Sequence, residues 1–455
     1  MKTVRRLFTA VVVTSLAVLG LAPATAQAAP ATRYDGVLPN GATWIADVPA
    51  TWNGTLLLYS HGYNPTPANP PVNSPGPAVA EALLARGYAL AGSSFSRPGW
   101  VTDTAAQDGL DTLEAVSGII GKPRRAIALG TSFGGMITGR LAERGGRQLD
   151  GAIATCGLMG GGIDLHNYQL DGSHAIAQLL LAGQQVKLVG FTGPAEAAAI
   201  SSRMLTALDQ AQASAAGRAR NALITALFQE PAWVAGQPKP TPGDVEAQQA
   251  GRYQNLRAIL PFILFGRYDM EQSAGGNPTW NKGVNYWRQL AESGLLAQVA
   301  QSYRQAGADL HTDLNLLTRT AGVTADPVAY RWMRETSTLT GRLDMPVLAM
   351  HTTDDALVPV QHVEEYAEDV RDSGSAALLR QAYTDHAGHC AFTTAELVAA
   401  VMTMEKRVET GRWGGLAEPR RLQDLAGSLG LGPAAFVGFR PPEFLGDRFT
   451  SSRHR

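Results

Sequence analysis

Hydrophobic positions alternate between two kinds of segment along much of the chain. Short apolar runs rich in aliphatic and β-branched residues are separated by longer segments whose apolar residues recur at helical spacing. The short runs that predict strands are GATWIADVP, GTLLLYSHG, GYALAGSSF, RRAIALG, LDGAIATCG, MPVLAMHTT and ALLRQAYTD. Helices are predicted near residues 76–86, 103–120, 133–144, 359–372 and 393–409. This alternation predicts an α/β fold in which helices flank a mostly parallel central sheet.

One long interval breaks the alternation. Residues 160–342 contain no convincing pair of strands, and segments such as EAAAISSRMLTALDQAQ have helical spacing. We predict a large, mainly helical insertion here, acting as a cap or lid on a domain formed by residues 29–159 and 343–455. From about Gly411 the chain is rich in proline and glycine, with one short helix near residues 418–428, and we expect it to wrap around the body of the protein.

The first 28 residues have the composition of an export signal. Three basic residues precede an uncharged apolar run from Leu7 to about Leu21, and ATAQA then offers a cleavage site ending at Ala28. The run is shorter than the roughly 20 residues that span a bilayer, which disfavours the alternative of a membrane anchor. We therefore expect residues 1–28 to be a signal peptide and the mature protein to be secreted, without stable insertion in a membrane.

Charge and cysteine content exclude several classes of function. The 38 Lys and Arg residues nearly balance the 39 Asp and Glu residues, and no block of like charges occurs. A nucleic acid is therefore not an expected partner. Two cysteines cannot form a Cys-rich zinc site, HExxH does not occur, and the segment DLHNY contains a lone histidine. We expect no metal ion and no cofactor.

The segment RRAIALGTSFGGM, residues 124–136, places a serine between glycines at the end of an apolar run. If residues 127–129 lie in a buried strand and a helix follows, Ser132 occupies a sharp turn that projects its hydroxyl into a cleft. Gly130 and Gly134 permit the close backbone contacts that such a turn requires. Because a chain with 49 glycines also offers this pattern in ordinary loops, the remaining sequence must decide whether Ser132 is a nucleophile.

A base and an acid that suit a serine nucleophile follow later strands. The segment HTTDDALVP follows one predicted strand directly, and TDHAGHCAF follows the next. The order serine, aspartate, histidine resembles that of the α/β-hydrolase superfamily: GTSFGG resembles its nucleophile turn, DALVP its acid loop and GHC its histidine loop. The resemblance covers residues 35–160 and 343–410 and implies an α/β-hydrolase fold. It also implies a catalytic triad of Ser132, Asp355 and His389.

Neighbouring side chains compete for two of these roles. Acid loops of the superfamily commonly read D-x-x-V-P, which selects Asp355 over Asp354, and the latter is then a solvated or turn-capping residue. His389 follows a glycine, as in the superfamily. Three nearby histidines lack this placement and are expected to be structural or surface residues: His351, His362 and His386. Of these three, His386 is the alternative base.

Acyl transfer also needs two hydrogen-bond donors for the oxyanion of its tetrahedral intermediate. One is expected to be the backbone N–H of Phe133, the residue after the serine. The other is expected from the loop after LLLYS, where HGY resembles the oxyanion loop of the superfamily and the N–H of Tyr63 is the candidate. His61, in the same loop, is expected to order the loop rather than to transfer a proton.

The two cysteines flank the expected site. Cys156 ends the strand after the serine helix, and Cys390 follows the expected base. In an exported chain, a disulfide between them is favoured over two buried thiols. A similar disulfide next to the histidine occurs in tannases and feruloyl esterases of the superfamily. Those relatives have a cysteine before the serine, where this chain has Thr131.

The insertion contains a segment dense in aromatic residues, glycine and asparagine, LPFILFGRYDMEQSAGGNPTWNKGVNYW. Trp280, Tyr286 and Trp287 are candidates for the lining of a substrate pocket over Ser132. Equally consistent with the sequence is that these aromatic side chains form the core of the cap itself.

Together these features favour a secreted serine hydrolase that cleaves a small-molecule carboxylic ester through an acyl-enzyme. A peptidase or amidase with the same triad ranks second, because no acidic pair that would anchor an amine can be assigned. A non-catalytic ligand-binding member of the fold ranks below both, since such a protein has no need of a complete triad in order. The acyl group and the oligomeric state do not follow from the sequence.

Overall fold

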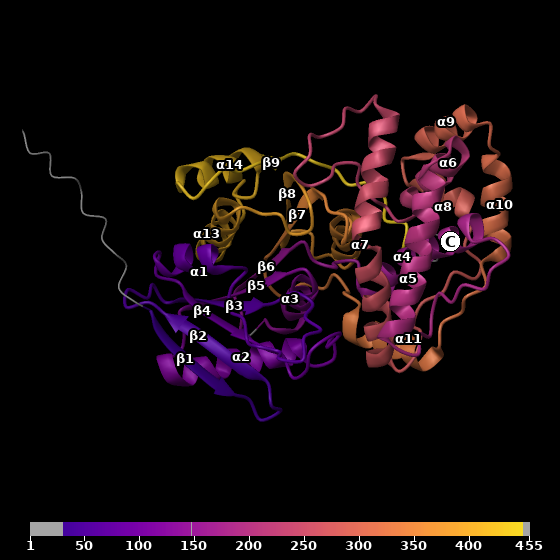
Figure 1. The fold of residues 1–455 in the computed structure, drawn as a ribbon. Helices are drawn as coiled ribbons and strands as arrows, with labels where there is room; N and C mark the ends of the chain where they lie inside the picture. The colour runs from indigo at the N-terminus through magenta and orange to yellow at the C-terminus, as the bar shows by residue number, and fades with distance from the viewer. Residues whose placement is uncertain (1–30, 147, 449–455) are drawn as a thin grey trace, which may run out of the picture.

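The computed structural model describes residues 31–146 and 148–448, which contain one nine-stranded sheet (Figure 1). The strands are β1 (Thr32–Val37), β2 (Thr43–Val48), β3 (Thr55–Ser60), β4 (Ala89–Ser93), β5 (Arg125–Thr131), β6 (Gly151–Thr155), β7 (Val347–Asp354), β8 (Leu379–Ala387) and β9 (Phe436–Val437). Their order in the sheet is β1-β2-β4-β3-β5-β6-β7-β8-β9. Strands β3 to β8 are parallel, whereas β1, β2 and β9 pair antiparallel. The predicted α/β fold with a mostly parallel sheet is confirmed.

Helices cover both faces of the sheet, which explains why the central strands are apolar along their whole length. In β3, Leu56 and Leu58 pack in one hydrophobic cluster while Leu57 and Tyr59 pack in the other. The first cluster is completed by α2 (Ala105–Ile120), α3 (Phe133–Arg144) and α12 (Gln361–Asp372). The second is completed by α1 (Pro77–Leu84), α13 (Thr394–Thr410) and α14 (Pro419–Ser428).

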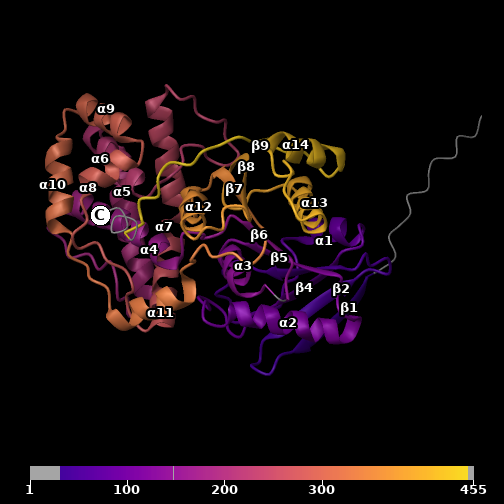
Figure 2. The ribbon, with the colours of Figure 1, turned by 180° about the vertical axis from the view of Figure 1, so that it is seen from behind.

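Between β6 and β7 the described chain is helical, as the spacing of residues 160–342 predicts. Its helices are α4 (Gly162–Leu180), α5 (Pro194–Gln212), α6 (Ala215–Leu227), α7 (Val245–Ala274), α8 (Tyr286–Glu292), α9 (Leu296–Ala306), α10 (Leu310–Thr320) and α11 (Pro327–Ser337). Figures 1 and 2 show them gathered to one side of the sheet. We call residues 160–342 the insertion. Its place between β6 and β7 puts it beside the loops that follow the parallel strands.

The chain after β9 crosses from the sheet onto the insertion, where residues 438–448 form what we call the C-terminal segment (Figure 2). The N–H of Leu445 donates to Gln229 Oε1 at 3.2 Å, and Gln289 Nε2 donates to the Leu445 carbonyl at 3.2 Å. Arg448 forms an ion pair with the buried carboxylate of Asp171 on α4, at 2.6 Å. This segment therefore joins the end of the chain to the insertion.

The predicted signal peptide, residues 1–28, lies outside the described residues. Across residues 31–146 and 148–448, no helix has the length and apolar character needed to cross a membrane.

Candidate active site

Ser132 occupies a strained turn between β5 and α3. Its backbone has φ 59° and ψ −122°, a conformation that residues other than glycine adopt at an energetic cost. The N–H of Ser132 donates to the Thr155 carbonyl on β6 at 2.9 Å, and its own carbonyl accepts from Gly135 at 2.8 Å. The turn is thus held by the adjacent strand and by the start of α3.

Two glycines permit this turn, because a side chain at either position would collide with backbone. A Cβ atom on Gly130 would lie 2.0 Å from the carbonyl oxygen of Gly134. A Cβ atom on Gly134 would lie 1.9 Å from the carbonyl oxygen of Ser60 on β3. Nonbonded carbon atoms prefer separations of about 3.5–4.0 Å, so no other residue fits at these two positions without moving the turn.

Three side chains from the ends of three parallel strands form a chain of hydrogen bonds. Ser132 Oγ lies 2.8 Å from His389 Nε2, and His389 Nδ1 lies 2.7 Å from Asp355 Oδ2. Because an ionised carboxylate can only accept, Nδ1 carries the proton and Nε2 has the free lone pair. In this tautomer His389 is able to accept the proton of the Ser132 hydroxyl.

Asp355 is buried and its carboxylate is fully engaged. Oδ1 accepts from the N–H groups of Leu357 and Val358, each at 2.9 Å, and His351 Nε2 lies 3.4 Å from Oδ2. Burial alone raises the pKa of Asp355, but the adjacent His389, with hydrogen bonds from His351 and His389, brings that pKa below its ordinary value. Asp355 is therefore a carboxylate at neutral pH.

Asp354, the competing carboxylate, contacts other groups. Its Oδ2 accepts from Thr353 Oγ1 at 2.8 Å and lies 3.7 Å from Lys239 Nζ of the insertion. Burial raises the pKa of Asp354. Its side chain is only 16% exposed and lies beside Lys239, whereas the sequence predicted a solvated or turn-capping carboxylate.

The other three histidines near the site make contacts away from Ser132. His386 Nε2 lies 2.9 Å from Glu396 Oε1, and Glu396 belongs to the capping box that begins α13. His362 Nδ1 accepts from the N–H of Gly160 at 3.0 Å. His351 Nε2 donates to the Val358 carbonyl at 2.9 Å, behind the carboxylate of Asp355. His386 and His362 are thus engaged elsewhere, and His351 supports the carboxylate of Asp355.

One candidate oxyanion donor follows Ser132 in the chain, and the other belongs to a loop that passes beside Ser132. Phe133 is the first residue of α3, so its N–H has no acceptor within the helix. The loop after β3 passes beside the serine, since a Cβ atom on Gly62 would lie 3.5 Å from Ser132 Cβ. The N–H of Tyr63 follows in this loop. His61 contacts the loop itself, with Nδ1 2.7 Å from the Gly62 carbonyl.

The insertion holds the side chain of Tyr63. Asp269 on α7 accepts from Tyr63 Oη and from the N–H of Trp100, each at 2.9 Å. Gly99 is needed beside this carboxylate, because a Cβ atom there would lie 2.6 Å from Asp269 Oδ2. Asp269 therefore ties helix α7 to the loop that carries a candidate oxyanion donor.

Replacing Asp269 by alanine is expected to lower kcat/KM for an activated ester by about ten- to a hundredfold, because a small displacement of a positioned group is costly in rate. Steady-state assays on purified protein would measure this. Asp209→Ala, which breaks an exposed pair with Arg257 on the insertion, is the matched control and should leave kcat/KM within about twofold. Equal rates for both variants would show that Asp269 does not position the loop.

A pocket opens next to Ser132 with about 450 Å³ of empty space, including its mouth. Its walls come from the serine turn and β3 loop, from α4 and α7 of the insertion, and from the acid loop. The lining residues are Tyr63, Trp100, Ser132, Phe133, Leu158, Leu165, His166, Gln169, Phe262, Ile263, Gly266, Leu357 and Val358. We call this the Ser132 pocket. Most of its surface is apolar, and Phe262 at 44% exposure is among the exposed large hydrophobic side chains of the protein.

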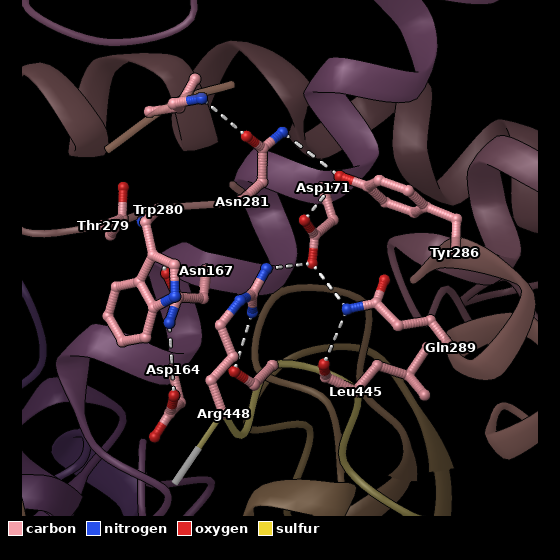
Figure 3. A network of polar contacts seen from close by, with 12 residues as sticks. Asp164, Asn167, Asp171, Thr279, Trp280, Asn281, Tyr286, Gln289, Leu445 and Arg448 are labelled. Atoms are coloured by element: carbon pink, nitrogen blue, oxygen red, sulfur yellow. Dashed lines mark hydrogen bonds and ion pairs between the residues drawn. The ribbon is translucent and has the colours of Figure 1, made fainter. Parts of the chain in front are cut away.

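The prediction that Trp280, Tyr286 and Trp287 face Ser132 does not fit the structure, because none of them lines the Ser132 pocket. Tyr286 Oη donates to Asp171 at 2.8 Å, and the indole of Trp280 lies in the same network beside Arg448 (Figure 3). Trp287 Nε1 donates to Asn315 on α10.

Helix α4 separates the two regions. One face of this helix presents Leu165, His166 and Gln169 to the Ser132 pocket. The opposite face presents Asn167 and Asp171 to the aromatic network. The alternative from the sequence, in which the aromatic residues belong to the packing of the insertion itself, fits this arrangement.

The expected disulfide is confirmed: Cys156, just after β6, is bonded to Cys390. Both residues have positive φ, at 44° and 56°, and Cys390 Sγ lies 3.4 Å from His389 Nε2. The bond therefore anchors the histidine loop to the strand next to the serine turn. Its sequence separation is 234 residues.

Replacing both cysteines by serine is expected to lower stability by up to about 5 kcal/mol, because the bond closes a long loop in the unfolded chain. Activity should fall at temperatures where the sheet remains folded, because His389 loses its anchor. Parallel measurement of melting by circular dichroism and of residual activity would check this. Activity that declines only together with the sheet would contradict a local role for the bond.

No family model matches the chain. Over 459 aligned residues it is 27% identical to an o-phthalyl amidase of Xanthobacter agilis, covering 93% of this chain and 98% of that protein. Among solved structures, feruloyl esterase B of Aspergillus oryzae has 13% identity and a TM-score of 0.38, with 84% of this chain and 80% of that chain covered. Tannin acyl hydrolase of Aspergillus niger has 15% identity and a TM-score of 0.38, with 84% and 78% covered. These structural likenesses are weak, so the fold is assigned from the sheet itself.

The sheet and the serine turn together identify the fold of the protein. A mostly parallel sheet with antiparallel strands at its edges carries Ser132 on a strained turn between β5 and α3. An aspartate and a histidine follow in that order, after β7 and β8. This arrangement resembles the nucleophile turn and the later acid and base loops of the α/β-hydrolase superfamily. The protein has the α/β-hydrolase fold.

Proposed function

We propose that the protein is a serine hydrolase that cleaves a carboxylic ester through an acyl-enzyme intermediate. The observation that carries this proposal is the chain of hydrogen bonds from Ser132 through His389 to Asp355, at 2.8 and 2.7 Å. It opens into an apolar pocket, the type of lining that suits an organic acyl group. A nucleophile, a base and an oriented acid are the parts that acyl transfer requires.

In the first half of the reaction, Ser132 Oγ attacks the ester carbonyl carbon while its proton moves to His389 Nε2. Asp355 keeps the ring in the required tautomer and stabilises the imidazolium that forms. The bond to the leaving oxygen then breaks, and that oxygen takes the proton from Nε2. In the second half, water attacks the acyl-enzyme, its proton passes to His389, and the acid leaves as the proton returns to Ser132.

Negative charge develops on the carbonyl oxygen in each half-reaction and needs donors that are already in place. We assign this role to the backbone N–H groups of Phe133 and Tyr63. The position of Phe133 at the start of α3 adds the partial positive charge of a helix N-terminus. The hydrogen bond from Tyr63 Oη to Asp269 then allows the insertion to position the loop that carries this donor.

An amide is the second candidate substrate, because the relative with 27% identity over 93% of this chain is an o-phthalyl amidase. The same residues suit amide cleavage, provided that His389 delivers its proton to the leaving nitrogen. A non-catalytic ligand-binding protein is the third candidate, and nothing in the contacts of Ser132 favours it.

Matched substrates that differ only in the bond cleaved separate these candidates. The enzyme would be assayed with methyl benzoate and benzamide, and with the corresponding methyl ester and amide that carry a carboxyl group at the ortho position. Each rate is compared with that of Ser132→Ala. Ester turnover that depends on Ser132 supports the proposal, whereas turnover of the amides alone would replace it with the second candidate. No turnover, together with no labelling of Ser132 by a fluorophosphonate, would favour the third candidate, a non-catalytic ligand-binding protein.

We further propose that the protein is exported before it acts. The Cys156–Cys390 disulfide supports this, since such bonds persist in oxidising compartments. Mass spectrometry of the protein recovered outside producing cells should find an N-terminus at Ala29. Retention of the full chain inside the cell would contradict export.

A further inference from the structure

The Ser132 pocket is apolar apart from a few groups, and one of them is a buried histidine. His166 lies on α4, is 2% exposed and lines the pocket. Its ring packs edge-on against Trp100, with ring centroids 5.1 Å apart. In the sequence this residue is the lone histidine of DLHNY, which suggests no role by itself.

One nitrogen of His166 is engaged and the other is not. Nδ1 lies 3.1 Å from Gln169 Oε1, one turn along α4. Nε2 is buried and has no hydrogen-bond partner among residues 31–146 and 148–448. Buried polar atoms are nearly always paired in folded proteins, so an unpaired nitrogen on a residue that lines a pocket points to a partner from outside the chain.

The surroundings of His166 determine which kind of partner fits. Burial and the neighbouring Arg267 hold the pKa of His166 well below its ordinary value, so the ring is neutral. The guanidinium of Arg267 is itself buried and donates to the backbone carbonyl of His166. In a neutral ring whose Nδ1 donates to the Gln169 oxygen, Nε2 carries the lone pair and accepts.

We propose that His166 is a specificity-determining residue that accepts a hydrogen bond from a hydroxyl or N–H group on the apolar part of the substrate. This inference rests on the proposed hydrolase function and narrows its substrate class. The substrate would be an acyl compound with an aromatic or similarly apolar group that carries one hydrogen-bond donor. A carboxylate at the same place has no proton to donate and would face the lone pair of Nε2.

The expected selectivity depends on the state of His166 Nε2 when the bound substrate has no hydrogen-bond donor. An isosteric methyl group provides no hydrogen bond, so Nε2 stays buried and unpaired. Sites that are built to bond a hydroxyl reject analogues that lack it far more strongly than apolar pockets reject a change of size. We expect the hydroxyl substrate to be preferred over its methyl analogue by about tenfold or more in kcat/KM.

The first test uses 4-nitrophenyl esters of benzoic and 3-phenylpropanoic acids that carry hydroxyl, methyl or carboxyl at the ortho, meta or para position. Wild-type enzyme should prefer the hydroxyl ester at one ring position. His166→Phe keeps a ring beside Trp100 but removes both nitrogens, so it should reduce that preference to about one while the methyl ester is still cleaved. His311→Phe is the matched control, because His311 lies on α10 against Trp287, and it should keep the full preference.

Three results would overturn the inference: hydroxyl and methyl esters cleaved equally by the wild type at every position, a preference that survives in His166→Phe, or a preference for the carboxyl ester. The last result would mean that Nε2 donates. Failure of the underlying hydrolase proposal is distinguishable, because the wild type would then cleave none of the esters and Ser132 would not react with a fluorophosphonate.

A second measurement does not depend on the folding of a variant. Nitrogen-15 NMR of the ring nitrogens in the wild-type protein, assigned by comparison with His166→Phe or His166→Gln, distinguishes protonated from unprotonated nitrogen. His166 should be neutral at pH 7, with a protonated Nδ1 and an unprotonated Nε2. A proton on Nε2 would overturn the assignment of His166 as an acceptor.

Discussion

Ser132→Ala is expected to lower kcat for ester hydrolysis by about 10⁴- to 10⁶-fold, because the variant has no nucleophile and the residual rate comes only from binding and the oxyanion donors. The melting temperature should change little. Alanine accepts the φ of 59° about as poorly as serine does, and the backbone hydrogen bonds of the turn do not involve the hydroxyl. Single-turnover assays and circular dichroism on the same preparation would separate the two quantities.

Labelling provides an independent check on the same residue. A fluorophosphonate should modify one peptide of the wild type, the one that contains Ser132, and should not react with Ser132→Ala. Activity retained in the variant, or a label on another serine, would mean that the hydrogen bond from Ser132 to His389 has no part in the chemistry.

Asp355→Asn should cost about 10⁴-fold in kcat, because an amide at this position presents a donor to Nδ1 and stabilises the wrong tautomer of His389. The side-chain oxygen of asparagine still accepts from the N–H groups of Leu357 and Val358, so the loop should keep its shape. The loss would therefore be in kcat and not in folding. Steady-state kinetics across pH would measure it.

Asp354→Asn is the matched control for this prediction, since it makes the same change one residue earlier. It removes a partner of Lys239 and no contact of His389, and ion pairs at partly exposed sites contribute at most about 1 kcal/mol. We expect activity within about fivefold of the wild type. If Asp354→Asn abolished activity while Asp355→Asn retained it, the acid would have to be reassigned.

The α/β domain could be predicted because each buried strand leaves its own apolar run in the sequence. Each buried parallel strand needs an uninterrupted apolar run, and each run ends at a polar loop on the same edge of the sheet, so Ser132, Asp355 and His389 converge once the strand order is known. The edge strands were not predicted. Strand β1 is largely exposed, with Arg33 and Asp35 on it, and β9 has two residues, so neither has the apolar run that marks a buried strand.

The pocket could not be predicted in the same way. Which face of α4 meets the serine depends on how the helices of the insertion pack, and helical spacing alone does not determine this. Density of aromatic residues pointed to Trp280 and Tyr286, whereas the pocket is lined by Phe262 from the start of the same segment and by His166. A lone histidine carries no signal in the sequence. The role proposed for His166 rests on its unpaired nitrogen and on its place in the lining of the pocket.

The insertion lies between Cys156 and Cys390 in the sequence, so the disulfide joins the parts of the chain on either side of it. This determines what proteolysis of the insertion produces. A protease that cuts one exposed loop between α6 and α7 produces two polypeptides, one with Ser132 and Cys156, the other with Asp355, His389 and Cys390. The covalent bond between the sulfurs keeps these pieces together, and the sheet holds the strands of each piece in register. The nicked protein is thus a two-chain hydrolase that migrates as one species until a reducing agent separates it.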